Sequence, residues 1–156
     1  MTYQDAARLL AEIRHERSNL ARAAGAVLAR KDATDETATY ALALLLMTYY
    51  TGAERIFQRI AAVLGGLPRE GARWHAQLLE DMSLDLPGVR PPVLRTATAD
   101  SLQRFLGFRH VVRNLYAWTI RREEMDLLVR ALPTVDADLG QDLERFGAFL
   151  EAAAAG

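Results

Sequence analysis

The sequence predicts an all-α fold, an antiparallel bundle with four core helices and short additional ones. Apolar residues recur at helical spacing, as at Leu9, Leu10, Ile13 and Leu20. No stretch shows the convincing two-residue alternation of a half-buried strand, and the connections between helical stretches are short. With 156 residues, 51% of them hydrophobic, the chain can bury one substantial core. We therefore expect a single domain spanning residues 1–156.

The first helix is expected from about Tyr3 to Arg30, because Thr2 followed by Asp5 resembles a capping box. A second helix starts after Thr34 or Asp35, either of which can act as its N-cap. It carries the apolar run YALALLLMTYY and should end at the glycine pair at positions 65 and 66, since glycine commonly terminates helices.

Prolines organise the second half of the chain. Pro68 is expected to open a shorter third helix that contains ARWHAQLLEDM. Three prolines interrupt LDLPGVRPPVL, which predicts the main loop. A fourth helix should run from Thr98 to about Trp118. The segments REEMDLLVRAL and ADLGQDLERFGAFLEA predict two further helices, divided by Pro133.

Composition and charge limit the function classes. The absence of cysteine excludes disulfides, thiolate metal sites and a cysteine nucleophile. A formal net charge of −1, from 19 basic and 20 acidic residues, provides no overall attraction to nucleic acid, so any polyanion site must be local. The charged N-terminus lacks a signal-peptide core, and the apolar run at 40–50 is shorter than the roughly 20 residues that span a membrane. We expect a cytoplasmic protein without a membrane segment.

Polar residues crowd one stretch of the expected fourth helix, GFRHVVRNLYAW. At about 100° per residue, Arg109, His110, Arg113 and Asn114 fall within an arc of about 140°, and apolar residues occupy the opposite arc. Tyr116 lies within about 20° of Arg109 on this wheel, so its phenol is expected to meet the guanidinium. The arc contains no acidic residue, and its arginines and histidine are donors suited to a phosphate.

These residues carry a resemblance to a known family. The segments RPPVLRTATADSLQRFLGFRHVVRNLYAW and EEMDLLVRALPTVDADLGQDLERFGAFL resemble the HepT-like branch of the HEPN superfamily, the ribonuclease toxins of bacterial toxin–antitoxin systems. YYTGAERIFQRIA and WHAQLLEDM fit the same pattern, so the resemblance spans nearly the whole chain. The family motif is Arg, a polar residue, three residues, His, one residue and Tyr. Arg109, His110 and Tyr116 match it, and Asn114 occupies the position of the motif His.

The resemblance implies a HEPN-like bundle and metal-independent RNA cleavage, in which the ribose 2′-hydroxyl attacks the neighbouring phosphate. The two motif helices would face each other across a homodimer. Arg109 and Arg113 would then be phosphate-binding donors. Asn114 cannot be the base, because a neutral amide does not titrate near neutral pH, and His110 is the candidate replacement. We expect no metal and no other cofactor. Pairing Arg104 with His110 is disfavoured, because Arg104 lies at the margin of the apolar arc.

The resemblance also implies a partner. Toxins of this kind are often encoded beside a minimal nucleotidyltransferase antitoxin, and the motif Tyr can receive AMP. Tyr116 would then be a modification site whose added negative charge competes for Arg109. The alternative is that Tyr116 packs at the dimer seam with its hydroxyl bonded.

Four residues outside the motif are notable. Glu54 and Arg55 lie within an otherwise apolar helix, where a buried charge needs a partner, and either could brace Arg109 or Arg113. The alternative is that these side chains are simply exposed. His75, beside Trp74, is expected to cap or pack rather than bind metal, because no second ligand stands at helical spacing. We interpret His15, between Arg14 and Glu16, as a solvated side chain.

Three functions remain open at this point. The protein is an RNA-cleaving toxin, or a catalytically inactive relative that binds RNA, a nucleotide or a partner protein through the same arc, or a structural helical dimer. In the last case the polar arc is an interface.

Overall fold

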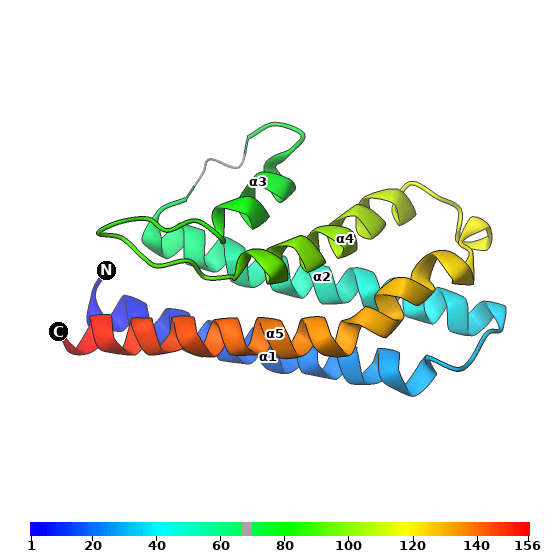
Figure 1. The fold of residues 1–156 in the computed structure, drawn as a ribbon, viewed down its shortest axis with the longest axis horizontal. Helices are drawn as coiled ribbons and strands as arrows, with labels where there is room; N and C mark the ends of the chain where they lie inside the picture. Colours follow the sequence, from blue (N-terminus) through cyan, green and yellow to red (C-terminus); the bar gives the residue numbers. More distant parts are fainter. Residues whose placement is uncertain (67–69) are drawn as a thin grey trace.

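The structure, a computed structural model, describes residues 1–66 and 70–156, and this part of the chain is an all-α bundle. The helices are α1 (Tyr3–Arg30), α2 (Glu36–Leu64), α3 (Trp74–Asp81), α4 (Thr96–Val112) and α5 (Arg122–Ala155), with a 3₁₀ turn, η1 (Ala117–Thr119), before α5. The long helices α1 and α5 lie side by side, and the two termini meet at one end of the bundle (Figure 1). The predicted fold class is confirmed.

Local signals place the ends of the first two helices. Thr2 accepts a hydrogen bond from the Asp5 amide at 3.1 Å, and the Thr2 amide donates to the Asp5 carboxylate at 2.9 Å, which completes the predicted capping box. Asp35 caps α2 by accepting from the Ala38 amide at 3.2 Å. Gly65, at a φ of 78°, ends α2 as expected.

The third helix and the proline-rich loop pack over α2 and α4. The expected opening of the third helix at Pro68 lies outside the described residues, and α3 itself begins at Trp74. The predicted loop is confirmed, and the buried guanidinium of Arg90 holds it by donating to the Leu84 carbonyl at 3.1 Å and to the Asp81 carboxylate at 3.1 Å. Burial lowers the pKa of Arg90, and Asp81 opposes that shift.

The fourth helix is shorter at its C-terminus than the sequence predicts. The expectation that it continues to Trp118 is wrong, because α4 ends at Val112. The amides of Asn114 and Leu115 bond the carbonyls three residues earlier, and the Asn114 side chain donates to the His110 carbonyl at 2.9 Å. The Asn114 side chain thus occupies a carbonyl that a continuing helix would need.

The last helix is longer than expected. The prediction that Pro133 divides two helices is wrong, because α5 is continuous over 34 residues with Pro133 inside it. The N-terminal third of α5 bends away from the line of the remainder (Figure 1). A proline in a helix interior removes one hydrogen bond and crowds the preceding turn, so Pro133 accounts for a bend in place of a break.

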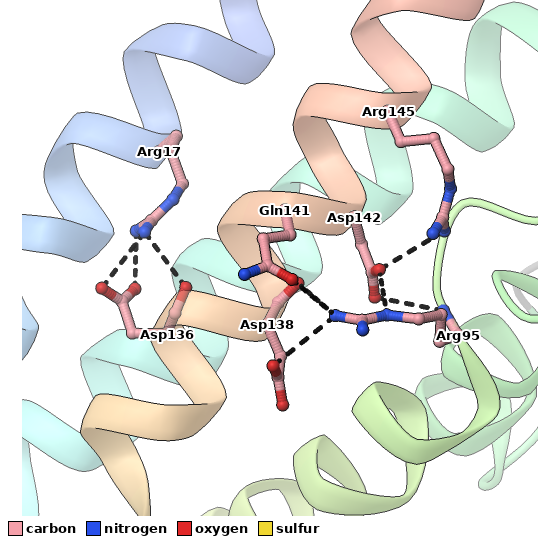
Figure 2. Close-up of polar contacts among 7 residues, drawn as sticks. All are labelled: Arg17, Arg95, Asp136, Asp138, Gln141, Asp142 and Arg145. Atoms are coloured by element: carbon pink, nitrogen blue, oxygen red, sulfur yellow. Dashed lines mark hydrogen bonds and ion pairs between the residues drawn. The ribbon is translucent and has the colours of Figure 1, made fainter.

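Two carboxylates on α5, the buried Asp142 and the half-buried Asp136, hold α4 and α1 against it. Asp142 is fully buried, accepts from the backbone amide of Arg95 at 3.1 Å, and also pairs with the Arg95 and Arg145 side chains (Figure 2). It therefore caps the start of α4 from a different helix. Arg17 of α1 pairs with Asp136 at 2.6 Å (Figure 2), and the same carboxylate accepts from the buried Tyr49 hydroxyl at 2.8 Å.

The core fills the space between α1, α2, α4 and α5 and extends under α3 and the loop. Its largest fully buried side chains are aromatic: Tyr49, Tyr50, Phe57, Phe105 and Phe146. Within the described ranges, none of the helices combines the length and apolarity needed to cross a membrane.

Candidate functional site

Arg109 lies in the interior, at the last turn of α4. Its guanidinium donates to both carboxylate oxygens of Glu54 on α2, at 3.3 and 3.0 Å, and to the Thr51 hydroxyl at 3.2 Å. The expectation that Arg109 belongs to an exposed arc without a counter-charge is wrong, because the residue is only 8% exposed and Glu54 neutralises it. The interpretation that Glu54 braces Arg109 from another helix is confirmed, whereas Arg55 points to solvent.

Aromatic side chains complete this interior cluster. The Arg109 Cζ atom lies 4.8 Å from the ring centroid of Tyr50, within cation–π range. Burial and the nearby Glu54 raise the pKa of Tyr50, and Arg109 acts in the opposite direction. A buried guanidinium with a carboxylate, a hydroxyl and an aromatic face around it is fully accommodated, so its first effect is to fix α4 against α2.

His75 joins the same cluster from α3. Its Nδ1 atom lies 2.7 Å from Glu54 Oε2 and 3.0 Å from Arg109 Nη2, and its ring stacks on Trp74 with centroids 3.6 Å apart. The prediction that His75 packs is confirmed by that stacking. Its place beside the motif arginine was missed, because the position of α3 over α2 and α4 leaves no signal in local spacing.

The remaining predicted site residues form what we call the α4-end row: His110, Arg113, Asn114 and Tyr116. All four are exposed. Within residues 1–66 and 70–156, the His110 ring and the Arg113 guanidinium have neither a hydrogen bond nor an ion pair. The Asn114 amide is engaged with the His110 carbonyl. This row can offer the Arg113 guanidinium and the His110 ring as donors to an external anion, which the enclosed Arg109 cannot do without breaking its pair with Glu54.

Tyr116 does not contact Arg109, contrary to the helical-wheel expectation, because the chain leaves the helix after Val112. Its ring instead stacks on Trp118, with centroids 4.8 Å apart and planes inclined by 5°. Both side chains are 70% exposed. The Tyr116 hydroxyl is therefore open to solvent.

An apolar groove runs beside the row, between α4 and α5, with a volume of about 790 Å³. Its lining includes Phe108, Leu128 and two strongly exposed residues, Val111 at 54% and Leu127 at 72%. Arg104 lies on this groove and is exposed, away from the Arg109 cluster. Among the described residues, His, Asp and Glu form no group of three or more that could hold a metal ion.

A comparison with models of protein families identifies the family of this chain. The model of the HepT-like protein family matches residues 41–150, most of the chain. The chain belongs to this family. No curated protein and no solved structure matches the chain. The matched range includes Thr51 and Glu54 on α2, His75 on α3, Arg109 on α4 and the α4-end row.

Proposed function

We propose that this HepT-like protein is a HEPN-type toxin of a toxin–antitoxin pair and a metal-independent endoribonuclease that acts at a homodimer interface. The observation that carries the proposal is the α4-end row, where Arg113 and His110 are exposed in the motif segment and where no carboxylate of the described residues pairs with either. An RNA phosphate needs such donors, and the row can supply them without rearrangement of the core.

The roles within the site divide by burial. Arg113 binds the scissile phosphate and stabilises the charge that builds on it. Arg109 positions the end of α4 through Glu54 rather than contacting RNA in this arrangement. Asn114 cannot accept the 2′-hydroxyl proton, which leaves two imidazoles near Arg109 as candidates for the base: His110 in the row and His75 on α3.

The apolar surface beside the row supports the homodimer. Val111, Leu115, Trp118 and Leu127 are exposed hydrophobic side chains near the end of α4 and the start of α5. Val111 and Leu127 line the same groove, exposed apolar surface is typical of interaction sites, and a twofold contact there would bring two copies of the row together. The cleavage site would then take residues from both subunits.

Tyr116 is the proposed point of control. A nucleotidyltransferase antitoxin could transfer AMP to its hydroxyl, which is exposed. The added phosphate would place negative charge next to the cationic row and compete with RNA for Arg113. Substitution of Tyr116 by Phe should abolish the transfer while leaving the fold intact.

The test combines growth arrest on induction with cleavage of RNA by the purified protein. Arg113→Ala should lower the cleavage rate by about 100-fold or more, because one donor to the transition-state charge is lost. Arg22→Ala on α1 is the matched control, since Arg22 is equally exposed but distant in sequence from the motif. Equal cleavage by both variants would contradict the proposal, and weaker dimerisation alone in Arg113→Ala would favour a structural interface.

A second candidate function follows from Asn114. A HepT-like protein without the motif His could bind RNA, a nucleotide or a partner protein through the same row without cleaving. This second function predicts that the wild-type protein shifts RNA in a gel-mobility assay without producing cleavage products. It also predicts that Asn114→His cleaves RNA. Cleavage by the wild type itself would exclude it.

A further inference from the structure

We propose that His75 is the general base of the cleavage reaction, with its Nδ1–H held by Glu54 and its Nε2 as the proton acceptor. This inference rests on the proposed ribonuclease function and assigns its base to α3 in place of His110. It rests on three contacts of the imidazole: with Glu54, with Arg109 and with Trp74.

The contacts of His75 favour one tautomer of its ring. An ionised carboxylate can only accept, so the 2.7 Å contact between Glu54 Oε2 and Nδ1 requires the hydrogen to be on Nδ1. Arg109 Nη2 is a donor only and cannot bond a nitrogen that already carries hydrogen. Arg109 Nη2 instead donates to Glu54 Oε2, which lies 3.0 Å away, as far as His75 Nδ1 does. The lone pair of the neutral ring therefore lies on Nε2.

Nε2 of His75 is available for a proton. It has no hydrogen-bond partner in the part of the chain that the structure describes, and the side chain is 27% exposed. A carboxylate that holds one ring nitrogen so that the other can act as a base is the arrangement found in catalytic histidine dyads and triads. Stacking on Trp74 fixes the plane of the ring as well.

His110 lacks these constraints. Its ring is exposed, and among the described residues nothing bonds either of its nitrogens. His75, in contrast, lies against the motif arginine, so an imidazole from α3 accompanies Arg109 in a chain whose motif has Asn114 in place of His. Arg113 is the C-cap residue of α4, one helical turn after Arg109, a spacing that places Cβ atoms about 5–6 Å apart, and the proposal requires a phosphate bound by Arg113 to reach His75 Nε2.

The proposed step is a transfer within RNA. The 2′-hydroxyl gives its proton to His75 Nε2 as its oxygen forms a bond to phosphorus. The bond from phosphorus to the 5′-oxygen breaks, and that oxygen takes a proton from water to leave as a hydroxyl. The products are a 2′,3′-cyclic phosphate and a 5′-hydroxyl end, and the imidazolium returns its proton to solvent.

The tautomer can be measured without any activity. The chain has three histidines, so the ¹⁵N imidazole signals can be assigned with His15→Asn, His75→Asn and His110→Asn. At a pH where the rings are neutral, His75 should show hydrogen on Nδ1 and an unprotonated Nε2. Hydrogen on Nε2, with Nδ1 accepting from Arg109, would overturn the assignment.

The kinetic test uses His75→Asn in the intact protein. The Asn amide can take the place of Nδ1–H beside Glu54, which preserves that contact but removes Nε2. We expect kcat to fall by about 100-fold or more with KM changed less than about twofold, as for loss of a general base. His15→Asn, an exposed histidine on α1, should cleave at the wild-type rate.

The two proposals fail in different ways. Wild-type protein that arrests growth and cleaves RNA, together with a fully active His75→Asn, would overturn the role of His75 and leave the ribonuclease function standing. Loss of cleavage in His110→Asn alone would do the same. Wild-type protein that binds RNA but never cleaves it would overturn the ribonuclease function, and the base assignment with it.

Discussion

Removing either partner of the Glu54–Arg109 pair should strongly destabilise the fold, because the other charge is then left buried without a counter-charge. Replacing Glu54 by Leu leaves a guanidinium that is 8% exposed, with His75 Nδ1 at 3.0 Å, the Thr51 hydroxyl at 3.2 Å and the Tyr50 ring at 4.8 Å, and with no carboxylate to balance its charge. Removing one partner of a buried ion pair costs about 3–5 kcal/mol. Typical domains unfold at about 5–15 kcal/mol, so this change would remove a large part of the total.

The magnitude can be isolated with a double-mutant cycle. Arg109→Leu should cost a similar amount, because it leaves the Glu54 carboxylate buried. The double variant should be less destabilised than the sum of the two single variants by at least about 2 kcal/mol, since apolar residues then replace both charges. For a chain of this size, the single variants should melt about 6–20 °C lower.

The assay is urea denaturation followed by circular dichroism, at one fixed protein concentration because dimerisation would add to the apparent stability. If each single variant lowered the free energy of unfolding by less than about 1 kcal/mol and the two effects were additive, the conclusion that Glu54 and Arg109 form a buried, coupled pair would be refuted. The result also bears on function, because loss of activity in Arg109→Ala would then reflect a loosened α4 rather than a lost phosphate contact. Arg113 is the more informative position for that question.

Three further predictions follow. Burial raises the pKa of Tyr49 and Tyr50 above 10.0. A tyrosine whose pKa is higher in the folded than in the unfolded state contributes its full stabilisation below the unfolded pKa and loses it as the pH rises above that value. Denaturation experiments above about pH 10 should therefore show the free energy of unfolding falling by about 1.4 kcal/mol per pH unit for each of the two tyrosines. Tyr49→Phe should remove the contribution of one of them to this slope. Asp81→Ala leaves the buried Arg90 guanidinium without its carboxylate partner and should lower the free energy of unfolding in urea by about 3–5 kcal/mol. The control Asp138→Ala should lower it by less than about 1 kcal/mol, because the Asp138 carboxylate is 37% exposed. Leu127→Asp should convert the dimer to monomer in sedimentation, while Leu44→Asp, also strongly exposed, should not; a monomeric wild type would contradict the proposed interface.

Sequence reasoning worked where the cause was local. The start of α1 follows from the capping box of Thr2 and Asp5, and the end of α2 from Gly65, because each signal acts within a few residues. The C-terminus of α4 was missed because Val111 and Leu115 continue the helical pattern although both are exposed. Periodicity alone does not show that an apolar residue is buried.

The α5 error has a different origin. Pro133 was expected to end a helix, and in isolation a proline costs about 3 kcal/mol in a helix interior. The surrounding turns pack on α1, and Leu132 and Val135 on either side of the proline are buried. Tertiary packing thus offsets the tendency of Pro133 to end a helix, and α5 bends instead of breaking.

The site shows the same limit more sharply. A helical wheel compares a residue only with others on its own helix, so the counter-charge of Arg109, 55 positions away, could not appear on it. The useful signal was on α2, where a charged Glu54 in an apolar helix required a tertiary partner. No comparable signal existed for His75, which reaches the cluster only through the placement of a short helix.

Placing the motif arginine inside the bundle changes how this HepT-like site has to work. Arg109 cannot leave Glu54 to bind a phosphate without stranding a buried carboxylate, so its influence on chemistry must pass through Glu54. That carboxylate also holds His75, which links the arginine, the acid and the imidazole in one chain of contacts across α4, α2 and α3. Stability and the proposed proton transfer therefore depend on the same carboxylate, and in the proposed function the exposed row binds the substrate.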